Sequence, residues 1–420
     1  MKKIVSLILA LALLLALTAC GSGTSAGTAE TTAPASTVDD SKGTQIDADG
    51  SVITKYDKAT VSTDKELPHF KILVLYNSFT DKLGSQYKSS MEYIAEPLNI
   101  EFTFLETGSN ADEATAAIEA ALVNGYDGCI GTVATEARAA LFDKAGVPYV
   151  VCGGMPSSEE QAKTMATYGA YLGSVVVDDY GAGWAMAEAL YANGCRNVMW
   201  DGLSRGYSGQ HDARAAGFFD AVATHDDMKI IVENWDYTQW ADGIATAAAT
   251  YPELDGVGCT CLMANIYNTI ESEGLVGSVL LAGIDVSEGT GRAFENGSLA
   301  YIAGGNYACE QICFAVLYNY LLDGTRVIAD PAVNLAMNNI NLNSLDDYNN
   351  YIKYLDSAVP AYTAQELLDM THYVDETFTA EKMVEVCKTY SLEDVMARHA
   401  DLVQLSLIHI SEPTRRVVIS

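Results

Sequence analysis

One stretch of the sequence has the spacing of a catalytic nucleophile. GLSRG, residues 202–206, fits the pattern G-x-S-x-G, and it is followed by Asp285, His372 and His399, in the Ser, Asp, His order of an α/β hydrolase. In such an enzyme the serine attacks an acyl carbon while a histidine takes its proton. The helix of a nucleophile elbow begins directly after the serine, whereas the loop-forming residues GYSGQ intervene here. We therefore expect Ser204 in a flexible loop and no enzyme, with serine hydrolysis as an alternative.

The nine cysteines offer a second chemistry, thiolate coordination of a metal ion. Cys259-x-Cys261 and Cys309-x3-Cys313 are close pairs, but only the second has the C-x2–4-C spacing of zinc ligands. No histidine lies near either pair in the sequence. Most cysteines stand in apolar runs such as GCIG and VVCGG, as buried small side chains do. We expect no metal.

Signals for nucleotide cofactors are incomplete. Gly181-x-Gly183 precedes a predicted helix, but Met186 stands where a dinucleotide fingerprint has its third glycine. The sequence contains no G-x-x-x-x-G-K-[ST] stretch, so any ATP hydrolysis must come from another chain, and it contains no H-E-x-x-H. We expect no cofactor.

The charge balance is strongly acidic, with 24 Lys and Arg against 55 Asp and Glu and a net charge of −31. Nucleic acids and anionic membranes repel such a surface. We therefore expect no nucleic acid partner.

The N-terminus has the layout of an export signal. Lys2 and Lys3 precede an apolar run at 4–19, which falls short of the roughly 20 residues that span a bilayer. The stretch LTAC, which ends at Cys20, resembles the lipobox of bacterial lipoproteins. This resemblance implies a signal peptide at 1–19 and lipidation of Cys20, which would anchor the protein to the outer face of the cell membrane. A secreted protein with a chance cysteine at its cleavage site is the alternative.

Two terminal segments differ from the rest of the chain. Residues 20–66 start with Gly, Ser, Thr, Ala and Asp and few large apolar residues, which favours a disordered tether. Residues 405–420 start with LSLIHISEPTR, which resembles the translation of a sequencing-library adapter, and end in the basic, apolar RVVIS. We expect 405–420 to be an adapter-derived scar, and a genuine C-terminal strand is the alternative.

Between these segments, short apolar runs alternate with amphipathic stretches. The first series predicts strands at 71–76, 100–105, 126–131 and 147–153 and helices at 82–97, 111–124 and 136–146. After Asp178 a second series predicts helices at 180–193, 210–223, 240–250 and 263–273 and strands at 196–202, 229–235, 255–261, 278–285 and 299–305. A long helix is expected at 307–323, followed by a short extended segment and acidic helices. The alternation predicts two successive α/β halves with parallel sheets.

Four motifs in a fixed order carry a family resemblance. An acidic turn and a Gly lead into an apolar helix at 175–190, Arg precedes Gly-Phe at 212–222, Pro ends a helix before a strand at 251–257, and Gly-x-Asp ends a strand within 282–304. Together they resemble the type 1 periplasmic binding proteins, in the branch that binds sugars for ABC importers.

The resemblance implies two Rossmann-like lobes with parallel sheets, joined by a hinge of three chain crossings. Ligand binds between such lobes, at the carboxyl ends of the strands, and the lobes close around it. The expected domains are a first lobe of 67–177 plus 305–330, a second lobe with hinge of 178–304 plus about 331–362, and a helical extension at 363–404.

The resemblance also suggests ligand-binding residues. Arg214 and Asp285 match the family's binding arginine and aspartate, which donate to and accept from neighbouring hydroxyls. Tyr237 falls where the family places a ring against a sugar, and Asn77 and Phe79 follow the first strand. For Phe79, packing in the core is an equal alternative.

Several positions depart from the family pattern. Gly153-Gly154 replaces an Asp-Arg pair, Lys82-Leu83 replaces an aromatic pair, Cys261 replaces an asparagine, and Gly304 replaces a glutamine. These changes predict a pocket that is less polar or roomier than a typical monosaccharide site.

The expected function is that of an extracytoplasmic solute-binding lipoprotein that delivers a sugar or sugar-like molecule to an ABC permease and its ATPase. We expect a monomer. A repressor with this fold would need a basic N-terminal DNA-binding module, and the chain has an export leader instead. A sensor that presents its closed form to a receptor stays an alternative.

Overall fold

The computed structural model describes residues 44–46, 52–54, 56, 58–108, 110–262, 264–356 and 359–411, and side chains within these ranges except at 44–46, 52–54 and 403–411. The expected leader, the lipidation residue Cys20 and residues 412–420 lie outside the described part. Among the described helices, none has both the length and the apolar character to cross a membrane.

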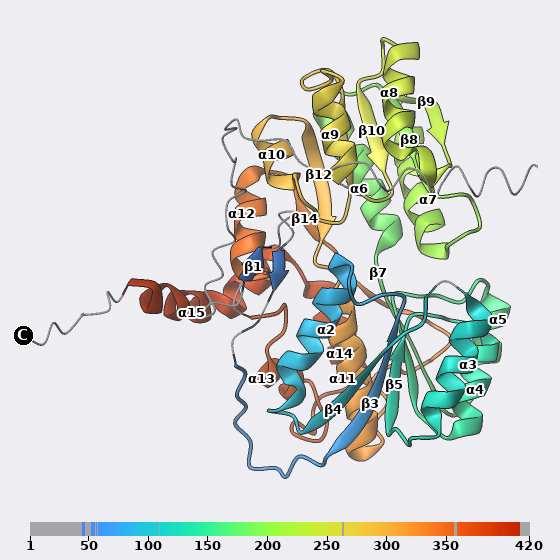
Figure 1. Ribbon diagram of the computed structural model, residues 1–420, viewed down its shortest axis with the longest axis vertical. Helices are drawn as coiled ribbons and strands as arrows, with labels where there is room; N and C mark the ends of the chain where they lie inside the picture. Colours follow the sequence, from blue (N-terminus) through green and yellow to red (C-terminus); the bar gives the residue numbers. More distant parts are fainter. Residues whose placement is uncertain are drawn as a thin grey trace, which may run out of the picture. The chain divides into compact units, whose positions relative to one another are not determined.

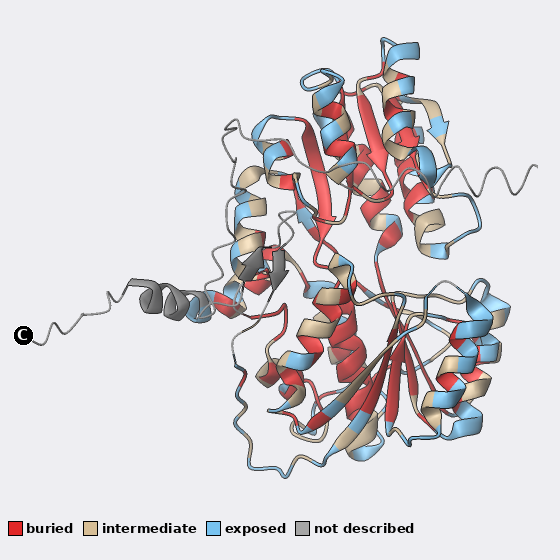
Figure 2. Ribbon diagram, in the orientation of Figure 1, coloured by how far each residue is buried: buried red, intermediate tan, exposed pale blue. Residues whose placement is uncertain are grey.

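The first lobe is built on a parallel six-stranded sheet in the order β13-β7-β6-β5-β3-β4 (Figure 1). Its strands are β3 (Phe70–Tyr76), β4 (Ile100–Glu106), β5 (Gly128–Gly131), β6 (Tyr149–Cys152), β7 (Tyr171–Val177) and β13 (Leu335–Met337). The inner strands β5, β6 and β7 are buried along their whole length, because helices cover both faces (Figure 2).

Alternate residues of β3 pack into different cores on the two faces of this sheet. Ile72 and Val74 join the core formed with α2 (Lys82–Ala95) and α11 (Ala308–Asp323). Leu73 and Leu75 join the core formed with α3 (Ala111–Leu122), α4 (Glu136–Ala145) and α5 (Glu159–Met165). The orange helix α11 in Figure 1 packs against β5, β6 and β7, which are far from it in sequence.

The second lobe has a six-stranded sheet in the order β14-β12-β11-β10-β8-β9, in which only β14 is antiparallel to its neighbour. Its strands are β8 (Asn197–Asp201), β9 (Lys229–Asn234), β10 (Gly256–Cys259), β11 (Leu280–Ile284), β12 (Leu299–Gly304) and β14 (Ile340–Leu342). Its helices are α6 (Asp179–Ala192), α7 (Gly209–Ala223), η1 (Tyr237–Gln239), α8 (Trp240–Thr250), α9 (Ala264–Ser272), α10 (Thr290–Glu295) and α12 (Leu345–Tyr354).

The chain crosses between the two sheets three times. It leaves the first sheet after β7 for α6, returns after β12 for α11, and passes from β13 to β14 at residues 338–339. The predicted fold class, two α/β lobes joined by three crossings, is therefore confirmed.

Two glycines allow helices α6 and α7 to pack with their backbones in contact. A Cβ on Gly183 would lie 1.9 Å from the carbonyl oxygen of Arg214, and a Cβ on Gly217 would lie 2.0 Å from that of Tyr180. Both distances are below van der Waals contact, so only glycine fits at this approach. The close packing fixes the position of Arg214 relative to the first turn of α6.

Helices after residue 363 pack around the hinge. α13 (Ala364–Asp369) contacts α11, α14 (Ala380–Thr389) contacts β13, and α15 (Leu392–Ser411) contacts α12. The last of these runs past residue 405, where we expected a scar to begin.

The expectation of a disordered tether at 20–66 is wrong for its C-terminal part. The backbone N–H of Ser62 donates to Gln365 at 2.7 Å, and the Tyr373 hydroxyl donates to the carbonyl of Glu66 at 3.0 Å. Ala59 is buried in the main core. A composition averaged over the whole segment hid these local contacts. Within the same range, β1 (Thr44–Ile46) and β2 (Val52–Thr54) pair as antiparallel strands.

Candidate ligand-binding site

Two adjoining cavities lie between the carboxyl ends of the two sheets. The larger, which we call the main cavity, measures about 520 Å³, and the side cavity measures about 400 Å³. Five residues line both, so the cavities are contiguous; these are Tyr76, Leu83, Cys261, Asp285 and Asn306. This is the edge at which open α/β sheets bind their ligands.

Arg214 lies in the wall of the main cavity, held by a buried ion pair. Its side chain, only 6% exposed, donates from Nε to Asp179 Oδ1 at 2.7 Å and from Nη1 to the carbonyl of Thr260 at 2.9 Å. Burial alone would lower the pKa of Arg214, but the nearby carboxylate of Asp179 raises it overall. Because these contacts fix Nε and Nη1, the guanidinium is pre-oriented for a ligand that accepts hydrogen bonds.

The neighbouring residues on α7 add neutral polar groups to the same wall. His211 Nδ1 lies 2.6 Å from Thr260 Oγ1. Burial lowers the pKa of His211 to about 3, and the positive charge of Arg214 contributes to the same shift. The imidazole is therefore neutral near pH 7, with one nitrogen donating and the other accepting. The side chain of Gln210, the residue before His211, donates across the cleft to the carbonyl of Gly153.

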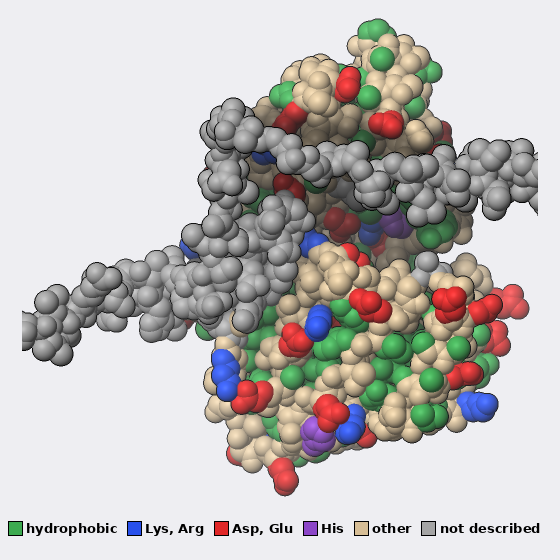
Figure 3. Space-filling view, in the orientation of Figure 1, with side chains coloured by type: hydrophobic (Ala, Val, Ile, Leu, Met, Phe, Trp, Pro, Cys, Tyr) green, Lys and Arg blue, Asp and Glu red, His purple; other side chains and the backbone are tan. Residues whose placement is uncertain are grey.

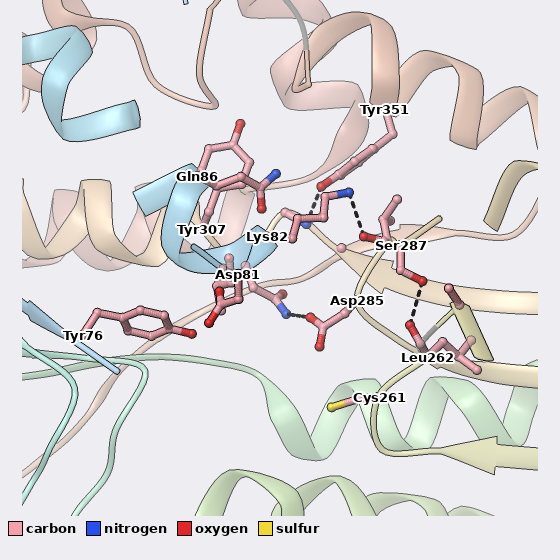
Figure 4. A pocket seen from close by; sticks show the side chains of 16 residues that line it. Tyr76, Asp81, Lys82, Gln86, Cys261, Leu262, Asp285, Ser287, Tyr307 and Tyr351 are labelled. Atoms are coloured by element: carbon pink, nitrogen blue, oxygen red, sulfur yellow. Dashed lines mark hydrogen bonds between the residues drawn. The ribbon is translucent and has the colours of Figure 1, made fainter. Parts of the chain in front are cut away.

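Asp285 is the acidic group that the two cavities share. Its backbone has φ +75°, a left-handed conformation that non-glycine residues seldom adopt. Its carboxylate accepts from Asn306 Nδ2 at 3.0 Å, and its amide donates to the carbonyl of Ala303 at 2.9 Å. These contacts hold the carboxylate between the cavities, and in Figure 4 the hydroxyl of Tyr76 points toward Asp81, with Asp285 beyond it.

The side cavity contains a lysine that connects the lobes. Lys82 Nζ, from α2, donates to the carbonyl of Val286 at 2.8 Å and lies 3.7 Å from Asp356 Oδ2 (Figure 4). Burial raises the pKa of Asp356, and Lys82 opposes this shift. Gln86 holds the other carboxylate oxygen at 2.9 Å. With Gln210 on the opposite side, Lys82 bridges the two lobes across the cleft.

Glycines account for two of the departures from the family pattern. A Cβ on Gly154 would lie 2.2 Å from the carbonyl of Thr132, and Gly153 has φ +72°. A Cβ on Gly304 would lie 2.9 Å from Val286 and 3.1 Å from Tyr351. Side chains at these three positions would collide with the cavity wall or strain the backbone.

Cys261 takes the place of a polar side chain between the cavities. Its sulfur lies 3.7 Å from Arg214 Nη1. Burial, and to a smaller extent the negative charge of Asp285, raises the pKa of Cys261 to about 12, so the thiol stays protonated near pH 7. It therefore presents a weak, uncharged group where a strong hydrogen-bonding side chain would otherwise stand.

The structure brings together only some of the residues that the sequence suggested. Arg214, Asp285 and Asn77 all line the main cavity. Phe79 lines neither cavity; its ring packs edge-on against Phe104 with centroids 5.2 Å apart.

Tyr237 also lies outside both cavities. It is 60% exposed in η1, which follows β9 at the edge of the second sheet. An edge strand ends far from the centre of the sheet, where the cavities lie.

Sequence reasoning missed Tyr76, Gln210, His211 and Asn306. A signal was available for two of them, since Gln210 and His211 precede Arg214 by four and three residues and so share its face of α7.

The serine hydrolase constellation is not assembled among the described residues. Ser204 is exposed and donates to the carbonyl of Trp235 at 3.0 Å. His372 contacts Asp323 and His399 contacts the carbonyl of Tyr354, so neither histidine is hydrogen-bonded to the serine.

Residues 70–266 match the family model described as "Periplasmic binding proteins and sugar binding domain of LacI family". The chain has the type 1 periplasmic binding protein fold. This match and the two lobes confirm the resemblance inferred from the sequence motifs. A search of curated proteins found no match.

Solved structures of this fold are similar over most of their length. A periplasmic sugar-binding protein from Pseudomonas fluorescens is 14% identical, with a TM-score of 0.62 over 78% of this chain and 99% of that one. A solute-binding protein from Actinobacillus succinogenes 130z, with bound D-allose, is 18% identical with a TM-score of 0.57 over 66% and 99%. One from Bacillus halodurans C-125, with bound myo-inositol, is 16% identical with a TM-score of 0.55 over 67% and 98%. At these identities the similarity shows the fold.

Proposed function

We propose that this type 1 periplasmic binding protein binds a sugar or sugar-like small molecule between its lobes and delivers it to an ABC permease, without changing it chemically. The main support is one arrangement in the cleft. Arg214 supplies a fixed donor and Asp285 a fixed acceptor on the wall of a single 520 Å³ cavity. This combination suits neighbouring hydroxyls, since each hydroxyl both accepts and donates hydrogen bonds.

The cavity dimensions refine the proposed ligand. The main and side cavities are contiguous, and the side cavity is lined largely by apolar surface from Leu83, Val286 and Tyr351. A polyhydroxylated group in the main cavity would leave the side cavity for a second, less polar group. We therefore favour a substituted sugar, a disaccharide or a nucleoside over a free monosaccharide.

Export and lipidation of Cys20 belong to the same proposal. The apolar run at 4–19 that ends at Cys20 supports them. Radiolabelled fatty acid incorporated in the wild type and absent in Cys20→Ala would establish the anchor, and a wild type without label would refute it.

The ligand class can be tested by thermal shift against monosaccharides, disaccharides, nucleosides and polyols. A ligand present at about 100 times its Kd should add about 2.7 kcal/mol to the free energy of unfolding. Mass spectrometry of the bound compound after release should return it unchanged. A chemically altered compound would favour an enzyme.

The site is tested by Asp285→Asn with Asp226→Asn as the control. Asparagine tolerates the left-handed backbone and keeps the shape, but it loses a charged acceptor. The expected loss of binding free energy is about 1–3 kcal/mol. Asp226 is exposed in the second lobe and lines neither cavity, so its variant should bind like the wild type. Equal affinity in both variants would refute the site.

A further inference from the structure

Three cysteines from distant parts of the chain meet at the wall of the first lobe. Cys152 ends β6, and Cys309 and Cys313 lie four residues apart on one face of α11, which packs against that strand. Their three sulfur atoms all lie within 4.8 Å of one another, and all three residues are buried. The pair at 309 and 313, which the sequence suggested alongside Cys259 and Cys261, thus finds its third sulfur in Cys152.

The spacing suits three-coordinate binding of one ion. Bonds of about 2.3 Å from one ion to three thiolates place the sulfurs roughly 3.5–4 Å apart, closer in a pyramidal complex such as that of trivalent arsenic than in a planar one. A disulfide would join only two of the sulfurs, at about 2.0 Å, and would leave the third unused.

The present partners of these thiols are weak. Cys309 and Cys313 donate to the carbonyls of Val175 and Val151 at 3.2 Å and 3.5 Å, and Cys152 donates to the Tyr87 hydroxyl at 3.6 Å. Because thiols are poor hydrogen-bond donors, the three sulfurs would lose only weak hydrogen bonds on coordinating an ion.

We propose that Cys152, Cys309 and Cys313 form a three-thiolate site for a soft metal or metalloid ion, reached from the ligand cleft. Cys152 and Cys309 line the main cavity, which gives the ion a path to sulfurs that are otherwise enclosed. Cys309 is also the second residue of α11, where the helix dipole favours a thiolate.

Charge selects the class of ion. The hydrogen-bond partners described for the three sulfurs are the Tyr87 hydroxyl and the carbonyls of Val175 and Val151, all of them uncharged. A divalent ion held by three thiolates leaves one negative charge in an apolar site, and a monovalent ion leaves two, which is costly. A trivalent centre leaves none. Arsenite fits: three S–H groups and As(OH)3 give three As–S bonds and three waters, with no change of oxidation state.

The test is a titration of the reduced, full-length protein with arsenite, followed by native mass spectrometry and by the ultraviolet absorption of As–S bonds. The wild type should bind one arsenic with loss of three hydrogens. Zinc should bind more weakly, since its complex is charged.

Cys313→Ala should weaken arsenite binding by more than the roughly 10–100-fold effect of removing an outer-shell partner. Cys129→Ala is the matched control, because Cys129 is equally buried in the first lobe and outside the cluster. Thermal melting checks that each variant is folded.

Three results would overturn the proposal. In the first, Cys313→Ala still binds arsenic with loss of three hydrogens. In the second, arsenite binds to the urea-unfolded wild type but not to the folded protein. In the third, protein purified without reductant contains a disulfide from Cys152 to Cys309 or Cys313, which would make the cluster a redox site instead.

Discussion

The buried ion pair between Arg214 and Asp179 provides the sharpest test of how the cleft is organised. Asp179→Asn keeps the shape of the side chain and one acceptor, but it removes the charge opposite a guanidinium that is 6% exposed. Removal of one partner of a buried pair costs about 3–5 kcal/mol, because the other charge stays uncompensated. Since asparagine still accepts from Nε, we expect about 3 kcal/mol.

A surface pair in the same lobe is a matched control. Arg196 Nε lies 2.8 Å from Asp227 Oδ2, against 2.7 Å in the buried pair, but its side chains are 34% and 60% exposed. Asp227→Asn should therefore cost less than about 1 kcal/mol. The two variants differ in burial and hardly in geometry.

Urea denaturation followed by tryptophan fluorescence suits this comparison, because all four tryptophans, at 184, 200, 235 and 240, lie in the second lobe. The double variant Asp179→Leu with Arg214→Met should recover most of the stability lost in Asp179→Asn, since apolar replacement of both partners is often neutral. It should still fail to bind ligand. Equal losses in Asp179→Asn and Asp227→Asn, or no recovery in the double variant, would refute the reasoning.

Three further predictions follow from the same lobes. Burial raises the pKa of Asp201 to about 8, so the folded protein keeps a proton that the unfolded chain releases, and stability falls as pH rises from about 4 to 8. Asp201→Asn should remove this slope, about 1.4 kcal/mol per pH unit, in urea midpoints at several pH values. Gly217→Ala should cost about 1–3 kcal/mol by urea denaturation, because its Cβ meets a backbone carbonyl across the helix pair, whereas Gly209→Ala meets only a flexible methionine and should cost little. Lys82→Met should weaken ligand affinity by roughly fivefold in calorimetry. The form in which Lys82 bridges the lobes loses its hydrogen bond to Val286, which contributes about 1 kcal/mol. Unchanged affinity would contradict a role of Lys82 in closure.

The alternation of apolar and amphipathic runs predicted most elements of the two sheets within a few residues. It missed β7, a mostly apolar run next to the first crossing, and the short helices α5 and α10. These elements are short or lack a distinct period, so none of them gave a clear signal.

The site was less predictable, because its geometry depends on sheet order and on long-range pairs. Tyr237 follows a strand that the sequence could not place at the edge. Asp179, the partner of Arg214, stands 35 residues before it and at the start of a different helix. By contrast, Arg214 and Asp285 belong to motifs in which local structure sets the position of the side chain. Arg214 lies on one face of a helix, and Asp285 follows the end of a strand.

The hinge is tied together more tightly than three separate crossings would be. The first and third crossings are joined directly, since Asp178 N donates to Met337 O and Asn339 Nδ2 donates to Asp178 O, both at 2.8 Å. A bend at one crossing alone would therefore have to break these two hydrogen bonds.

The chain after residue 363 also holds the second and third crossings. The Tyr390 hydroxyl donates to Gly305 O at 3.0 Å, and Asn338 N donates to Cys387 O at 3.0 Å. Because Gly305 also donates to the Tyr351 hydroxyl of α12, the second crossing is held from both sides. A hinge works by φ and ψ changes at a few residues, and each of these bonds limits them. These bonds favour rotations of the lobes that keep the three crossings together, and any opening of the cleft would have to break the hydrogen bonds from Lys82 to Val286 and from Gln210 to Gly153.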